Sequence, residues 1–133
     1  EVPFEGTLKE NLTFGDNSIS EDRILEAIKS VQLLDFLKDQ PNGIQTHIYP
    51  EGRQIPYTVA KKIVLARAIL KSPKLLILEN TFDSFEREEA NMIIDYLCKE
   101  EHSWGLLVVS TRKYWEEHCD EVVNMENGKT VIV

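Results

Sequence analysis

Apolar residues recur every three or four positions in the first half of the chain, a spacing that places them on one face of a helix. The first such helix is predicted to begin at Ser20, a residue type that caps helix N-termini, with acidic residues in its first turn. Its apolar positions are Ile24, Leu25, Ala27, Ile28 and Val31. A short helix over 33–37 should end at Pro41-Asn42-Gly43. Residues 1–19 and 44–55 show no clear period and are expected to be irregular.

The longest helical pattern covers Pro56–Leu70. Pro56 suits the first turn of a helix, where a missing N–H costs little. Four apolar residues fall on one face and four more widen that face, so this helix is expected to be largely buried. The first four are Val59, Ile63, Ala66 and Leu70.

The second half of the chain alternates strand and helix patterns. Leu75–Leu78 is a continuous apolar run, typical of a strand covered on both faces of a parallel sheet. Asp83 is predicted to cap the next helix, with Glu86 three positions later completing a capping-box pattern. Gly105–Val109 is a second buried strand, so the three elements should form a right-handed βαβ unit.

The last residues have the pattern of a β-hairpin. Asn127-Gly128 separates the segments 121–125 and 129–133, and Asn-Gly is a strong signal for a two-residue hairpin turn. The predicted fold class is therefore α/β, with a mainly helical subdomain over 1–72 and strands, a βαβ unit and a hairpin over 73–133.

Composition narrows the possible partners. The chain has 133 residues and a net charge of −8, which argues against nucleic acid as a partner because phosphate backbones attract basic surfaces. Its two cysteines have no metal-ligand spacing and are expected to be reduced thiols. No apolar run approaches the roughly 20 residues of a membrane helix.

Five segments carry a family resemblance. Residues 3–12 read PFEGTLKENL, close to LFSGTIRENI. Residues 63–70 read IVLARAIL, close to RIALARALL, and Gly52-Arg53-Gln54 precedes them. Residues 72–78 read SPKLLIL, close to DPPLLILD, and residues 120–129 contain DEVV and NGK, close to ADRIVVLDNGRIV. In this order the segments resemble the second half of an ABC transporter nucleotide-binding domain of the exporter type.

The resemblance implies a single partial domain over 1–133, with a P-loop NTPase-like fold. Family members bind ATP and Mg²⁺, pair with a second nucleotide-binding domain and contact a membrane-spanning domain. The chain is thus expected at the cytoplasmic face of the cell (inner) membrane. The P-loop and Q-loop glutamine of the family would precede Glu1, so no ATP is expected to bind the isolated chain.

The family's signature, Leu-Ser-Gly-Gly-Gln, brings backbone N–H groups close to a phosphate at a helix N-terminus. At these positions the chain has Ile55 followed by Pro56, Tyr57, Thr58 and Val59. Proline removes a donor, and the next two residues add side chains where phosphate would lie. The signature is therefore interpreted as degenerate. A surface for another ligand and a plain helix start are both compatible with this pattern.

The remaining family positions are also altered. Glu79 replaces the Walker B aspartate and could still contact Mg²⁺, while Asn80 replaces the catalytic base, and an amide cannot accept a proton from water at neutral pH. The family's D-loop, usually Ser-Ala-Leu-Asp, is replaced by Asp83-Ser84-Phe85-Glu86, so that Glu86 stands at the position of its last residue. Thr111 replaces the switch histidine.

Three functions remain open at this stage. The first is a degenerate ATP-binding domain of an ABC-type exporter, with a structural, dimerising or regulatory role and little or no hydrolysis. The second is an ABC-like fold reused for protein binding, with a contact surface around Tyr49, Pro50, Pro56 and Tyr57. The third is a working ATPase in which Glu79 or a nearby carboxylate substitutes for the missing base.

Overall fold

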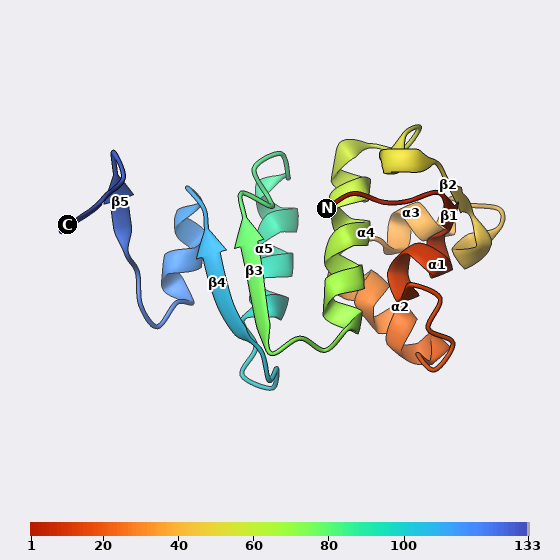
Figure 1. The fold of residues 1–133 in the computed structure, drawn as a ribbon, viewed down its shortest axis with the longest axis horizontal. Helices are drawn as coiled ribbons and strands as arrows, with labels where there is room; N and C mark the ends of the chain where they lie inside the picture. Colours follow the sequence, from red (N-terminus) through yellow and green to blue (C-terminus); the bar gives the residue numbers. More distant parts are fainter. Residues whose placement is uncertain (133) are drawn as a thin grey trace.

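The computed structural model describes residues 1–132, and it places a group of helices beside two parallel strands, with a hairpin at the far end (Figure 1). The α-helices are α1 (Leu8–Thr13), α2 (Glu21–Ser30), α3 (Leu34–Lys38), α4 (Tyr57–Leu70) and α5 (Arg87–Leu97). The short 3₁₀ turns are η1 (Gly43–Gln45), η2 (Pro50–Gly52) and η3 (Lys113–Glu117). The strands are β1 (Gly6–Thr7), β2 (His47–Ile48), β3 (Leu75–Glu79), β4 (Gly105–Val109), β5 (Asn124–Glu126) and β6 (Lys129–Val131).

The two long helices of the first half agree with their apolar patterns. The Ser20 side chain accepts a hydrogen bond from the Arg23 N–H at 3.2 Å and caps α2 as predicted. All four residues of the predicted inner face of α4 are buried, and this helix packs against α1 and α2. Pro56 is the N-cap of α4. The sequence predicted it one position later, in the first turn of the helix.

Helix α1 was not predicted from the apolar spacing, because it is only six residues long. Its signal lies in its cap: the Thr7 side chain accepts from the Glu10 N–H, and the Glu10 carboxylate accepts from the Thr7 N–H. This is a capping box, which satisfies two backbone donors at once. The expectation of an irregular N-terminal segment is therefore wrong for Leu8–Thr13.

The N-terminal segment is held by a buried polar pair, Asn11 and Arg67. The Asn11 side chain accepts from the Phe4 N–H and donates to the carbonyls of Phe4 and Thr7, at 2.9 to 3.1 Å. Arg67, on α4, donates from Nε to the Asn11 carbonyl at 2.8 Å and from Nη2 to Asn11 Oδ1 at 3.1 Å. The two side chains thus join the first eleven residues to the central helix.

Gly52 allows the chain to turn directly against α4. Its φ is +74°, and a Cβ built there would lie 3.0 Å from the Ala60 Cβ and 3.3 Å from the Pro3 side chain. Glycine is required at this point for both its backbone conformation and its lack of a side chain. The predicted loop 44–55 is otherwise largely confirmed, with only β2 and two 3₁₀ turns in it.

Strands β3 and β4 pair in parallel, with Leu75 opposite Gly105 and Glu79 opposite Val109, so the predicted β–α–β order is confirmed. The expectation that both faces are covered is wrong for the described chain. Leu76 and Leu78 are buried, on the side of α5, but the opposite face exposes Leu75, Ile77, Leu107 and Val109, each by more than half. Figure 1 shows α5 against one face of this pair of strands, and no described helix covers the other face.

The predicted cap of α5 is also wrong. The helix begins at Arg87 with Glu86 as N-cap, and neither Asp83 nor Glu86 forms a side-chain cap. Phe82 and Phe85 are both buried, so the backbone between them folds as a turn and the helix starts only after it.

The C-terminal hairpin is confirmed, with shorter strands than predicted. Strand β5 begins at Asn124, whereas the sequence placed its start at residue 121. Asn127 and Gly128 both have positive φ, 50° and 76°, as a two-residue hairpin turn of this type requires. The predicted last strand position, Val133, lies outside the described residues. Among the described helices, none has the length and apolar character needed to cross a membrane.

Candidate functional site

The structure brings three of the altered family positions together at the carboxyl edge of β3 and β4. Glu79 ends β3 and is exposed on the same face as Ile77. Asn80 follows it and donates its backbone N–H to the Val109 carbonyl at 2.8 Å. Thr111 lies two residues beyond β4 and is exposed. Parallel strands end at the same edge of a sheet, which explains why these residues are neighbours.

Asn80 has a left-handed backbone conformation, with φ of +48°. Asparagine tolerates this conformation better than most residues. Its carbonyl accepts the Asp83 N–H at 3.4 Å, so the residue opens the turn that leads to α5. The side chain is an exposed amide, which offers a donor and an acceptor but no basic group for water activation.

Arg112 clamps the turn between β3 and α5. Its Nη2 donates to the carbonyls of Phe82 and Phe85, each at 2.6 Å, and its Nε donates to Phe82 at 3.0 Å. The Phe82 ring packs edge-to-face on Phe85 and stacks on Trp115, with ring centroids 5.2 and 6.0 Å apart. The turn is therefore held by a charged donor at its backbone and by aromatic packing at its side chains.

Replacing Arg112 with alanine is expected to lower the free energy of unfolding by about 2 kcal/mol, because hydrogen bonds from a charged donor to two carbonyls are lost. Chemical denaturation followed by circular dichroism measures this change. Lys113→Ala, at the exposed neighbouring position, is the control and should lie within about 0.5 kcal/mol of the parent chain. Equal stability of the two variants would contradict the clamp.

The signature position lies at the start of α4. Pro56 is its N-cap and supplies no N–H, Tyr57 is 63% exposed, Thr58 is half-buried and Val59 packs in the core. The Lys61 ammonium lies 5.3 Å from the centre of the Tyr57 ring. A bulky aromatic ring and its lysine thus occupy the surface over the first turn of the helix.

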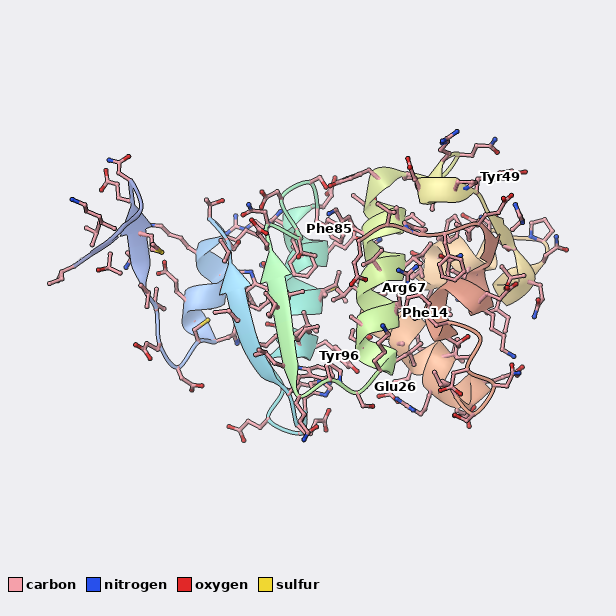
Figure 2. All side chains as sticks on the ribbon, in the orientation of Figure 1. Phe14, Glu26, Tyr49, Arg67, Phe85 and Tyr96 are labelled. Carbon is pink, nitrogen blue, oxygen red and sulfur yellow. The ribbon has the colours of Figure 1, made fainter. Side chains whose placement is uncertain are left out.

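The start of α4 and the turn before α5 are neighbours. The Lys62 ammonium forms an ion pair with the Glu89 carboxylate and lies 5.9 Å from the centre of the Phe85 ring. Figure 2 shows Phe85 on the side of the turn that faces α4. Local sequence patterns do not predict this contact, because it joins residues that are 23 or more positions apart.

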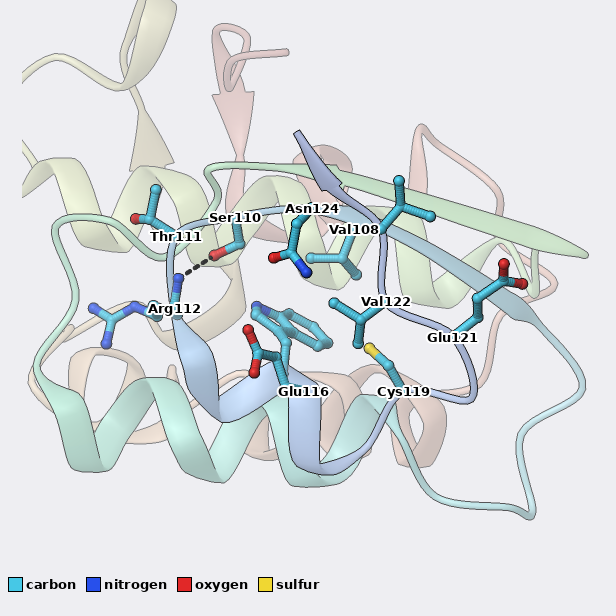
Figure 3. A pocket seen from close by; sticks show the side chains of 11 residues that line it. Val108, Ser110, Thr111, Arg112, Glu116, Cys119, Glu121, Val122 and Asn124 are labelled. Atoms are coloured by element: carbon cyan, nitrogen blue, oxygen red, sulfur yellow. Dashed lines mark hydrogen bonds between the residues drawn. The ribbon is translucent and has the colours of Figure 1, made fainter. Parts of the chain in front are cut away.

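Thr111 lines a small cavity of about 130 Å³ between the end of β4, η3 and the segment before β5 (Figure 3). Glu116, Cys119 and Glu121 line it as well. The Arg112 N–H bonds to Ser110 Oγ at 3.0 Å, and its side chain points away from the two glutamates. Ligand sites usually measure about 300–1,000 Å³, so this cavity is too small for a nucleotide.

These surfaces differ from the phosphate-binding helix start that the family's signature forms. Pro56 supplies no N–H at the start of α4, and the exposed Tyr57 side chain lies on its first turn. The cavity beside Thr111 is lined by the carboxylates of Glu116 and Glu121 and by Arg112. No cluster of three metal-ligating side chains occurs among residues 1–132, so Glu79 stands alone as a possible Mg²⁺ ligand. Glu86 is exposed at the N-cap of α5.

The two cysteines are free thiols, as expected. Burial raises the pKa of the Cys98 thiol to about 11, with smaller contributions from Cys119 and Asp95. Burial also raises the pKa of Cys119, and Asp120 and Glu116 add to the effect. Both groups are therefore protonated at neutral pH and are weak nucleophiles.

Known proteins resemble the chain over almost its whole length, although no family model matches it. It is 30% identical over 130 residues to ABC transporter B family member 18 of Arabidopsis thaliana, covering 96% of this chain and 11% of that protein. It is 29% identical over 129 residues to the ATP-dependent lipid A-core flippase of Xanthomonas oryzae pv. oryzae, covering 96% and 22%. The solved structure of a bacterial Atm1-family ABC exporter with ATP bound superimposes over 99% of the chain with a TM-score of 0.87 at 17% identity.

The chain is a partial ABC domain. It spans 11% and 22% of the two curated relatives and 23% of the solved exporter. The order of segments in the sequence agrees with this family, and the arrangement of α4, β3, α5 and β4 agrees with the fold of the solved exporter.

Proposed function

We propose that this ABC domain belongs to an exporter-type membrane transporter and serves a structural, dimerising or regulatory role with little or no ATP hydrolysis. It would contact a membrane-spanning domain and a second nucleotide-binding domain on the cytoplasmic side of the membrane. The names of the relatives, a transporter family member and a flippase, support the transporter assignment.

Asn80 carries the proposal of lost hydrolysis. It lies at the exposed edge where β3 ends, and its amide cannot act as a general base. Loss of a general base typically lowers a rate by about 10²–10⁴-fold. The missing N–H of Pro56 and the exposed ring of Tyr57 at the start of α4 support the same conclusion.

A working ATPase that uses Glu79 is the alternative with a specific observation behind it. Glu79 is exposed and lies one residue from the base position. The alternative predicts that Glu79→Gln abolishes hydrolysis, whereas our proposal predicts that this change has no effect.

The test is steady-state ATP hydrolysis by the longest natural polypeptide that contains this chain, measured beside an intact ABC exporter. We expect turnover at least about 10²-fold lower than that of the intact exporter, and unchanged in Glu79→Gln. Ser84→Ala, in the same turn, is the matched control. Turnover close to that of the intact exporter, lost in Glu79→Gln and kept in Ser84→Ala, would refute the proposal.

A further inference from the structure

A short basic link joins the end of α4 to the start of β3, and it reads Lys71-Ser72-Pro73-Lys74. Ser72 and both lysines are exposed, and Pro73 is half-buried. Figure 1 shows the link leaving α4 beside α2 on its way to β3. The link is basic although the chain as a whole carries a net charge of −8.

Ser72 is the one serine or threonine of the sequence that is followed by proline. The other four prolines follow Val2, Gln40, Tyr49 and Ile55. Proline has no N–H and a fixed φ, so this serine precedes a backbone that no other serine of the chain precedes. Protein kinases of the proline-directed class select serine and threonine by this next residue.

The Ser72 hydroxyl already contacts a guanidinium group. Arg23, near the start of α2, donates from Nη2 to Ser72 Oγ and to the Leu70 carbonyl, both at 3.1 Å. Guanidinium groups form paired, charge-assisted bonds with phosphate oxygens, and these are stronger than bonds to a neutral hydroxyl. A phosphate on Ser72 would therefore lie beside an arginine without a change of fold.

The space next to this bond is large enough for a phosphate. A cavity of about 460 Å³ lies between α1, the start of α2 and the end of α4, and Arg23, Lys71 and Ser72 line it. Asp16 lines it as well, but its carboxylate accepts from the Ser18 N–H and hydroxyl at 2.9 and 2.6 Å. The described lining thus carries two cations and one carboxylate, which favours an added anion.

The cations near Ser72 have no carboxylate partner. Among the ion pairs of residues 1–132, none involves Arg23, Lys71 or Lys74. The Lys71 ammonium lies 4.3 Å from the centre of the Phe14 ring, which holds it beside the cavity. A phosphate on Ser72 would supply the anionic partner that these side chains lack.

We propose that Ser72 is a phosphorylation site of a proline-directed protein kinase, and that Arg23 and Lys71 hold the phosphate. In the transfer, Ser72 Oγ attacks the γ-phosphorus of the ATP bound to the kinase. The bond from that phosphorus to the bridging oxygen breaks, ADP leaves, and the hydroxyl proton passes to the base of the kinase. The phosphate joins α2 to the link before β3, so it stiffens the boundary between the helices and the strands.

Incubation of the 133-residue chain with Mg-ATP and, separately, a cyclin-dependent and a mitogen-activated protein kinase tests the site. We expect a single phosphate, which tandem mass spectrometry assigns to Ser72. Pro73→Ala keeps the hydroxyl and should slow incorporation by at least about tenfold. Ser103→Ala, at an exposed serine followed by tryptophan, is the matched control and should not change it. No incorporation by either kinase, or incorporation at another residue, would overturn the proposal.

Phosphorus NMR of the phosphorylated chain tests the role of Arg23. The second pKa of phosphoserine is about 6, and neighbouring cations favour the dianion, so we expect this pKa to lie about 0.5–1 lower in the folded chain and to return in urea. Arg23→Gln should remove most of the shift, whereas Arg53→Gln, which changes the net charge equally at another exposed arginine, should keep it.

Thermal denaturation gives a second measure of the same contact. Phosphorylation should raise the melting temperature by about 2–5 °C in the parent chain and in Arg53→Gln, and by clearly less in Arg23→Gln, because the new charge-assisted bonds are lost there. A phosphate whose second pKa stays at about 6 in the folded chain, or whose shift is the same in Arg23→Gln, would show that Arg23 does not hold it and would overturn that part of the proposal.

Discussion

Replacing Arg67 with alanine is expected to lower the free energy of unfolding by about 4 kcal/mol. Arg67 is 3% exposed, and its guanidinium donates to the Asn11 carbonyl, Asn11 Oδ1 and the Val2 carbonyl. It also lies 5.3 and 4.7 Å from the ring centres of Phe4 and Phe14. Removing it leaves buried acceptors unpaired and two aromatic rings without their cation, which explains the size of the effect.

Burial lowers the pKa of Arg67, and Glu1 opposes that change, so the side chain stays charged at neutral pH. Lysine cannot reproduce the fork that reaches both oxygens of Asn11, so Arg67→Lys should recover only part of the loss. Denaturant titration of each variant measures the effect.

The matched control is Arg23→Ala. Arg23 also donates across the fold, to the Leu70 carbonyl and Ser72 Oγ at 3.1 Å, but it lies at an exposed position. Water can replace those bonds, so we expect a loss of at most about 1 kcal/mol. If Arg67→Ala lowered the free energy of unfolding no more than Arg23→Ala, the buried pair of Asn11 and Arg67 would not hold the N-terminal segment.

Replacing Trp115 with alanine is expected to lower the free energy of unfolding by about 3–4 kcal/mol. Trp115 is 5% exposed and is the one buried residue among residues 98–132. Its ring stacks on Phe82, which in turn contacts Phe85. Because Trp115 is the buried side chain of η3, a cavity at that point should also loosen η3.

Two measurements separate these effects. Denaturation gives the stability change, and limited proteolysis reports cleavage after residue 112, which should rise in Trp115→Ala under conditions where the core remains folded. Trp115→Phe keeps an aromatic ring and should cost about 1 kcal/mol with little added cleavage. Rapid cleavage of the parent chain at the same sites would show that Trp115 does not anchor the segment.

Elements with a strong local signal were predictable. The α2 cap at Ser20, the inner face of α4 and the Asn127-Gly128 turn all depend on residues a few positions apart. The capping box of Thr7 and Glu10 is equally local, but α1 has only two turns and is too short to show a helical apolar period, so that period does not predict it. The order of family-like segments also indicates an ABC domain from the sequence alone.

The sequence by itself determined the family, the succession of helices and strands, and the residue types at the altered positions, because these depend on local pattern and side-chain chemistry. Only the tertiary structure decided that α5 begins after Glu86 and that one sheet face is exposed. It also showed that Arg112 binds the carbonyls of residues 30 and 27 positions earlier. Such contacts join segments distant along the chain, and neither period nor spacing carries information about which backbone carbonyl a distant side chain will reach.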